Sequence, residues 1–198
     1  DVATFIYHAV NIDGPVVVAA RGLGIPGGFM SGSAVDEFWS FSLEFYDRPG
    51  VSECLIELQD RFGADVNLLL FCCWCGASGR PPVDEPQLRE AMAQTGIWQS
   101  DVVQRLRSLR RDMKAGIDGV PLSDSNPVRE EIKRLEIKCE RIEQMRLAGL
   151  AHLAREVRSI ASIRIALEAY FRLLGVEKKT ITREYIAQLA SACGQWDE

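Results

Sequence analysis

Two cysteines are the residues whose type and spacing point most directly to chemistry. Cys72 and Cys75 are separated by two residues, and such a pair can bind a metal ion or exchange thiols and disulfides. A zinc site with four ligands needs a second pair, whereas the remaining cysteines outside this cluster are scattered singly: Cys54, Cys139 and Cys193. A cysteine in an apolar segment usually packs as a small hydrophobic side chain. We therefore expect packing, keep Cys72 and Cys75 as a candidate metal pair, and expect no cofactor.

The cysteines lie in residues 65–76, a segment that predicts a buried helix at the centre of the fold. The segment is apolar on every side, which is typical of an element buried all round. Gly63 and Asp65 give a start signal, and Gly76 gives a stop. A buried strand stays open on periodicity alone, and the caps and helical neighbours favour the helix. At about 15 Å, such a helix is too short to cross a membrane.

Aromatic residues in and before this segment can line a pocket for a flat apolar ligand. Serine, glutamine and asparagine side chains among them would supply the polar groups that orient such a ligand. The candidate pocket residues are Trp39, Ser42, Tyr46, Gln59, Asn67 and Trp74. The alternative is an ordinary aromatic core, in which Asn67 serves the first turn of its own helix.

The most basic stretch of the chain is a candidate partner-binding face. Arg107, Arg110, Arg111 and Lys114 are three or four residues apart, so they share one side of a helix. Phosphate groups or an acidic protein would suit this face. The alternative is pairing with acidic residues of the next predicted helix: Glu130, Glu131, Glu136, Glu140 and Glu143.

Support for catalysis is slight. The sequence has no glycine-rich phosphate loop, no H-E-x-x-H helix and no nucleophile elbow. Neighbouring carboxylates such as Glu130 and Glu131 point in different directions on a helix, so they make no acid–base pair. His152 is the only histidine after Met30, and we expect it to be structural. We expect a protein without enzymatic activity and propose no catalytic residue.

Composition indicates one compact domain in a reducing compartment. The chain has 198 residues, of which 47% are hydrophobic, and this suffices for one well-formed core. A net charge of −5 argues against a dedicated nucleic-acid binder. No apolar run reaches the roughly 18 residues of a membrane helix, so we expect no membrane association. Neighbouring cysteines make poor structural disulfides, which favours reduced thiols and a cytoplasmic location.

Residues 1–29 read as an N-terminal extension. They carry an apolar run and then a glycine-rich stretch, without the ordered features of a secretory signal. The segment from Met30 to Phe38 resembles a natural protein start that leads into a helix. We expect residues 1–29 to form a disordered tail or, if folded, a short edge strand at residues 16–19. Residues 30–198 then form a single helical domain.

The hydrophobic pattern after Met30 predicts an all-α bundle of about seven or eight helices. Capping residues, glycines and prolines set the expected boundaries. In one case Gly96 separates a short helix that ends near Ala93 from the helix that follows. The predicted helices cover residues 36–46, 51–62, 65–75, 84–93, 97–113, 127–149, 157–174 and 182–193.

The helix predicted to start at Asn126-Pro127 carries apolar residues at alternating spacings of four and three. This heptad-like seam is typical of helices packed side by side. It offers a second surface for a partner, or for a homo-oligomer formed through residues 127–147. Its seam residues are Val128, Ile132, Leu135, Cys139 and Ile142.

Several motifs together resemble a known family. They are residues 38–43 (FWSFSL) with Tyr46, residues 49–51 (PGV), Leu58-Gln59, Gly63, residues 65–71 (DVNLLLF) and Trp74. A later segment, residues 106–114, is also similar. The resemblance is to a small proteobacterial family known only as a domain of unknown function, and residues 1–29 fall outside its pattern. It implies an all-helical cytoplasmic bacterial protein that begins near Met30, and it implies no activity.

Two functions are the strongest candidates after these observations, and nucleic-acid binding and an unrecognised enzymatic activity are weaker alternatives. The first is a non-enzymatic cytoplasmic protein that binds another macromolecule, as an interaction or adaptor module, through the basic face or the heptad-like seam. The second is a small-ligand or metal-binding protein that uses the aromatic cluster and the Cys72/Cys75 pair. We prefer the first, with an unidentified protein as the expected partner.

Overall fold

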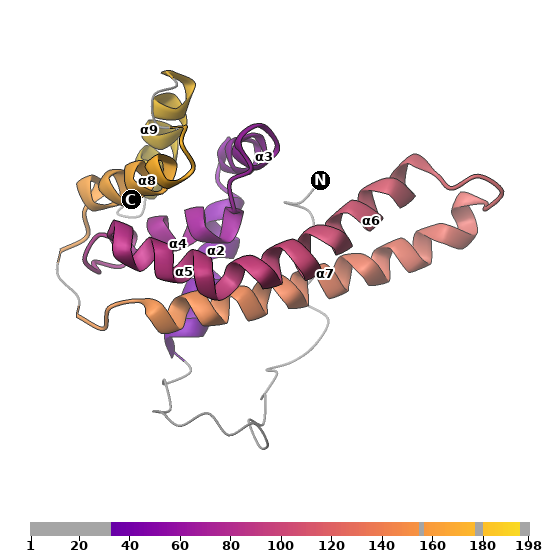
Figure 1. Cartoon of the computed structure of the whole chain (residues 1–198), viewed down its shortest axis with the longest axis horizontal. Helices are drawn as coiled ribbons and strands as arrows, with labels where there is room; N and C mark the ends of the chain where they lie inside the picture. Colours follow the sequence, from indigo (N-terminus) through magenta and orange to yellow (C-terminus); the bar gives the residue numbers. More distant parts are fainter. Residues whose placement is uncertain (1–32, 155–156, 177–179, 195–198) are drawn as a thin grey trace, which may run out of the picture.

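The computed structural model describes residues 33–154, 157–176 and 180–194, and these residues form helices joined by short connections (Figure 1). The predicted all-α fold is confirmed for them. They contain no strand, and Ile117 and Val120 form one isolated bridge in the turn between two helices. The predictions for residues 1–29, the start at Met30 and the strand at residues 16–19 fall outside the described residues.

Helix α4 (Val66–Ala77) is the centre of the fold, as the sequence predicts. Asp65 caps it by accepting a hydrogen bond from the Asn67 backbone nitrogen at 2.9 Å. Every residue from Asn67 to Gly76 is buried. Five helices pack around α4: α2 (Ser33–Tyr46), α3 (Val51–Phe62), α7 (Leu122–Leu150), α8 (Ile160–Leu173) and α9 (Thr180–Gly194).

The absence of a side chain at Gly76 lets α8 approach α4 closely. A Cβ atom built at Gly76 would lie 2.3 Å from Ile163 Cγ1 and 3.1 Å from the Ile163 backbone nitrogen. The Gly76 carbonyl also accepts a hydrogen bond from the Ser159 backbone nitrogen at 3.3 Å. Gly76 therefore contributes helix packing in addition to any effect on the end of α4.

Replacing Gly76 by alanine is expected to lower the free energy of unfolding by about 1–3 kcal/mol, because the new methyl group overlaps buried Ile163. Gly96→Ala is the matched control. Gly96 also lies in a helix, but a Cβ atom built there would meet no described atom within 4 Å, so this change should be neutral or stabilise by up to about 1 kcal/mol. Denaturant unfolding of both variants checks the difference, and equal effects would contradict this packing role.

The predicted break at Gly96 is wrong. Helix α5 (Glu85–Trp98) continues through Gly96, and a π-helical turn (Gln99–Val103) joins it directly to α6 (Gln104–Ala115). An exposed glycine costs a helix only about 1 kcal/mol, which tertiary packing can offset. The Trp98 indole nitrogen donates to the Cys139 carbonyl at 3.0 Å and ties this continuous rod to α7.

Four predicted helix starts are also wrong, and one of them is at α9, which begins at Thr180 and not at residue 182. Helix α2 begins at Ser33, so that Asp36 lies in its first turn instead of capping it. Helix α7 begins at Leu122, because the first turn already closes onto the Pro121 carbonyl, and Pro127 lies inside the helix. Helix α8 begins at Ile160, after the Ser159 cap, and Val157 is exposed instead of contributing to the apolar face.

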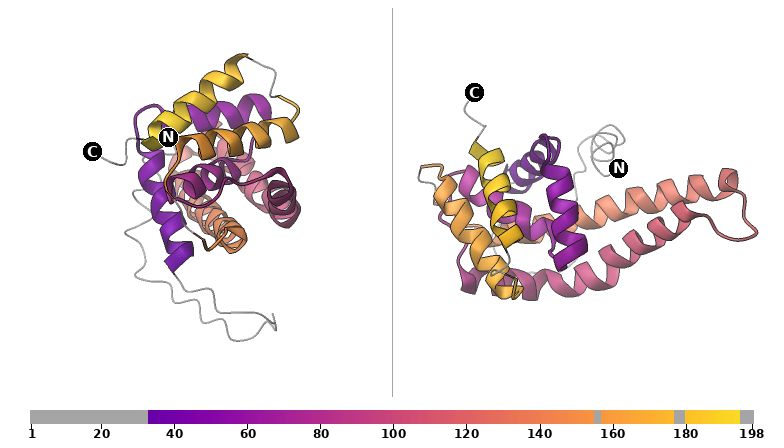
Figure 2. Two further views of the ribbon diagram at one scale, coloured as in Figure 1. Left: turned by 90° about the vertical axis from the view of Figure 1, so that its left-hand side faces the viewer. Right: turned by 90° about the horizontal axis from the view of Figure 1, so that it is seen from above.

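Helices α6 and α7 lie side by side and project beyond the rest of the molecule as a helical hairpin (Figures 1 and 2). With 29 residues, α7 is about 43 Å long. Its C-terminal half packs on the body formed by α2, α4 and α5, and its N-terminal half extends with α6. Within the described residues, no helix is long and apolar enough to cross a membrane.

Candidate functional site

A chain of buried polar side chains joins α2, α4 and α7. The Asn67 amide donates to Glu143 Oε2 at 2.9 Å, and its oxygen accepts from the Gln144 amide, also at 2.9 Å. Ser42 donates to the Gln144 side-chain oxygen at 3.2 Å and to the Phe38 carbonyl at 2.9 Å. The side chain of Asn67 thus forms hydrogen bonds with Glu143 and Gln144 of α7, in addition to any role in the first turn of its own helix. Hydrogen-bonded buried groups of this kind fix the register of neighbouring helices.

Two carboxyl groups meet at one end of this chain. The carboxyl groups of Asp65 and Glu143 lie close enough to interact electrostatically, and the second carboxyl oxygen of Glu143, Oε1, is buried without a hydrogen-bond partner among the described residues. Burial raises the pKa of Glu143 to about 10, and the neighbouring Asp65 carboxylate adds to the effect. Burial also raises the pKa of Asp65. The backbone nitrogen of Asp65 donates to the Tyr170 hydroxyl at 2.8 Å, so α8 closes this end of the site.

A cluster of arginine and glutamate side chains fastens α6 to α7. Arg107 donates to Glu136 Oε1 at 2.9 Å and to Glu140 Oε1 at 2.5 Å, and it also contacts Gln59 of α3. Arg110 donates to Glu136 Oε2 at 2.6 Å. Burial alone would lower the pKa of Arg107, but the Glu140 and Glu136 carboxylates outweigh it and raise that pKa. Glu136 is almost fully buried, so the cluster is a structural joint between three helices.

The predicted basic face is therefore divided between two roles. Arg107 and Arg110 turn inward and pair with Glu136 and Glu140 of the next helix, which is the alternative that the sequence left open. Arg111 is exposed and pairs with Asp60 of α3 at 3.1 Å, and Lys114 is exposed near the end of α6. Partner binding by this face stays a prediction, and Arg111 and Lys114 are its exposed cations.

The six residues predicted to line a ligand pocket lie in different parts of the molecule, and two of them, Trp39 and Gln59, are only partly buried. Ser42 and Asn67 lie in the buried polar chain, and Gln59 contacts Arg107. Trp74 stacks on Phe38 with ring centres 4.7 Å apart. The guanidinium of Arg80 lies over the same tryptophan, 4.0 Å from its ring centre. Tyr46 is buried, which raises the pKa of its hydroxyl, and Trp39 lies beneath Arg141.

Cys72 and Cys75 are buried free thiols. Burial raises the pKa of Cys72 well above its ordinary value and that of Cys75 to about 12. A metal ligand or nucleophile is the thiolate, so this environment opposes both reactions. Among the described residues, no group of three or more His, Cys, Asp or Glu side chains could hold a metal ion.

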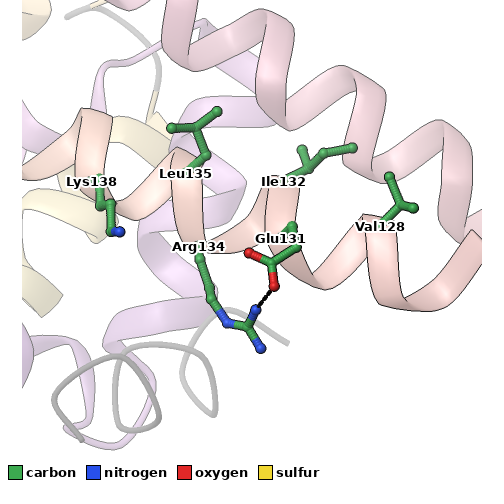
Figure 3. A pocket seen from close by; sticks show the side chains of 6 residues that line it. All are labelled: Val128, Glu131, Ile132, Arg134, Leu135 and Lys138. Carbon is green, nitrogen blue, oxygen red and sulfur yellow. Dashed lines mark hydrogen bonds and ion pairs between the residues drawn. The ribbon is translucent and has the colours of Figure 1, made fainter. Parts of the chain in front are cut away.

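The surface of α7 carries an exposed apolar stripe, formed by Val128, Leu135 and Ile142. Their exposed fractions are 53%, 50% and 40%, although each is a large hydrophobic residue. Val128 and Leu135 of the stripe line a shallow depression on α7. Figure 3 shows them with Ile132 on one side of the helix and the Glu131–Arg134 ion pair on an adjacent side. Three exposed apolar residues in a row on one helix are typical of an interaction surface.

Sequence reasoning missed the partnership of Asp65 with Glu143 and the role of Gln144. One signal was present: Glu136 and Glu143 are seven residues apart on a helix with a heptad-like pattern, so they share one side of it. Charged residues that repeat on the buried side of a helix need partners from neighbouring elements. Arg107 and Asn67 are those partners here.

The described residues form an all-helical protein with a buried polar chain, a projecting hairpin and an exposed apolar stripe on α7. Residues 37–147 match the family described as Protein of unknown function (DUF2390), and this match covers more than half of the chain. The chain therefore belongs to that family. The matched residues run from α2 to near the end of α7 and include the polar chain, the arginine–glutamate cluster and the stripe. No curated protein and no solved structure matches the chain.

Proposed function

We propose that this protein is a non-enzymatic protein-interaction module that binds its partner through the α6–α7 hairpin. The observation that carries the proposal is the exposed α7 stripe, in which Val128 lies on the projecting half of the helix and Ile142 on the half that packs on the body. Leaving three large apolar side chains in water gives no stability to the isolated chain. Burial of these side chains against a partner would supply the binding free energy.

The interior is built to hold such a surface in a fixed position. The arginine–glutamate cluster anchors α6 to α7, and the Asn67–Glu143 hydrogen bond anchors α7 to the central helix. A rigid surface loses less conformational entropy on binding than a mobile one. This arrangement supports an adaptor that presents a preformed helical face.

Other features agree with this role in the cytoplasm. All six cysteines are free and buried, which suits a reducing compartment. Exposed Arg111 and Lys114 lie on α6 of the same hairpin and would favour a partner with an acidic rim.

Affinity capture from a cell extract tests the proposal when it compares matched variants. Leu135→Glu places a charge in the stripe, whereas Ile165→Glu places one on α8 at a residue of similar exposure, 53%. We expect wild type and Ile165→Glu to retain the same protein, either a second copy of the chain or another protein, and Leu135→Glu to lose at least about 90% of it, the equivalent of 1.4 kcal/mol. Equal recovery with all three proteins would contradict the proposal.

A further inference from the structure

The α6–α7 hairpin leaves an apolar side uncovered along both of its helices. No residue of α6, a helix described throughout, is buried, and its Leu109 is about half exposed. Arg107 and Arg110 occupy the side of α6 that faces Glu136. Leu109 therefore lies away from those pairs, on the more exposed part of the helix. Two helices cannot enclose a core alone, and a second helical pair packed on the first is the common solution.

The α7 stripe is symmetric about its middle residue. Val128 precedes Leu135 by seven residues, and Ile142 follows it by seven. Each step is about 10.5 Å along the helix axis. When two such helices run antiparallel and cross at Leu135, Val128 of each copy lies opposite Ile142 of the other. The stripe is thus complementary to itself, as a two-fold interface requires.

The charges beside the stripe favour the same arrangement. Glu131 lies about 6 Å before Leu135 along the axis, and Lys138 lies about 4.5 Å after it. An antiparallel pair centred on Leu135 brings Glu131 of one copy beside Lys138 of the other, twice. A parallel pair would place the Glu131 and Lys138 side chains of the two copies on opposite sides of the interface, so it would form neither of these contacts. Glu131 pairs with Arg134 within its own helix, yet its side chain remains largely exposed.

We propose that the occupant of the α7 stripe is a second copy of this chain, in a homodimer whose α7 helices pack antiparallel with Leu135 on the two-fold axis. This inference rests on the proposed function, because it names the partner of the same surface. The two hairpins together form a four-helix arrangement in which Leu109 and the stripe are covered.

Sedimentation equilibrium of the full chain tests the homodimer. The wild type should be in a monomer–dimer equilibrium at micromolar concentrations, and Leu135→Glu should weaken it by at least about tenfold. Ile165→Glu is the control and should dimerise as the wild type does. Circular dichroism should show that each variant keeps its helices, because both substituted residues are exposed.

Charge reversal tests the antiparallel register. Glu131→Lys and Lys138→Glu should each weaken the dimer about fivefold, because each sets like charges opposite one another, and the double variant should regain the wild-type dissociation constant within about twofold. A wild type that stays monomeric at about 100 μM overturns the homodimer. A dimer that Leu135→Glu does not weaken also overturns the homodimer. A double variant that dimerises more weakly than either single variant overturns the antiparallel register.

The two proposals fail in different ways. A monomeric wild type that still captures another protein through Leu135 overturns the homodimer and leaves the interaction module standing. A monomer whose capture does not depend on Leu135 overturns both.

Discussion

Replacing Arg107 by alanine is expected to lower the free energy of unfolding by about 3–5 kcal/mol, the usual cost of leaving buried charges without their partner. Arg107 holds Glu136 at 2.9 Å and Glu140 at 2.5 Å, and Glu136 is almost fully buried. Its loss leaves Arg110 as the remaining described partner of Glu136. The loss should also loosen α6 from α7, because Arg107 contacts α3 and α7 together.

Arg111→Ala is the matched control, because it removes the same side-chain type four residues further along α6. Arg111 is about half exposed and pairs with exposed Asp60, so its removal should cost about 1 kcal/mol or less. Denaturant unfolding of both variants gives the comparison. An Arg107→Ala effect no greater than that of Arg111→Ala would show that the cluster does not hold the hairpin.

The contribution of Glu143 to the free energy of unfolding is expected to fall as pH rises from about 4.5 to about 10. Burial raises the pKa of Glu143 to about 10 from an ordinary value of 4.5, so the folded protein holds a proton that the unfolded chain has already released. Between these two values, one such proton lowers the free energy of unfolding by at most about 1.4 kcal/mol per pH unit. Stabilisation by this group is therefore complete below about pH 4.5 and is lost as pH approaches 10.

Glu143→Gln removes the titrating group and retains an amide of similar shape. The variant should lose most of this pH dependence and should be at least as stable as the wild type at pH 8, because a glutamine amide is neutral without taking up a proton. Glu57→Gln is the control, since Glu57 is exposed and pairs with Arg61 at the surface. Denaturant unfolding from pH 5 to 9 checks both. If the wild type and Glu143→Gln have parallel pH profiles, the pKa of Glu143 is not raised in the folded protein.

Features encoded locally in the sequence could be predicted. The central helix combines an Asp65 cap with an unbroken apolar run, and no competing interaction changes it. The helix ends at Gly63 and Gly175 also follow from local rules, since both glycines adopt a positive φ. By contrast, local rules wrongly predict that a helix ends before Gly96. The helix continues there because of the π-helical turn and the packing of Trp98 on α7, and neither can be predicted from the sequence of that segment alone.

The buried polar chain could be predicted only in part. Asn67 stands out in the sequence as a polar residue in an apolar helix, but its partner Glu143 is 76 residues away and looks like part of an acidic surface. Pairing of the Arg107 face with the glutamates of α7 is one of two alternatives that the sequence allows. Which of them holds depends on the rotation of α6 against α7, a property of the tertiary packing.

The heptad-like seam could also be predicted, whereas its exposure could not. Cys139 is buried, while Val128, Leu135 and Ile142 remain accessible along α7. The spacing of apolar residues shows that they share one side of a helix, but it does not show whether the chain itself covers that side. This difference turns a packing seam into a candidate interaction surface.

Site-specific photocrosslinking in living cells tests the role of the α7 stripe most directly. A photoreactive amino acid at position 135 should form one dominant covalent product with a protein, and the same amino acid at position 165, a residue of similar exposure, should not. A product of twice the chain mass would identify the second copy. Absence of any product at position 135, or the same products at both positions, would contradict the account of this protein as an interaction module that works through α7.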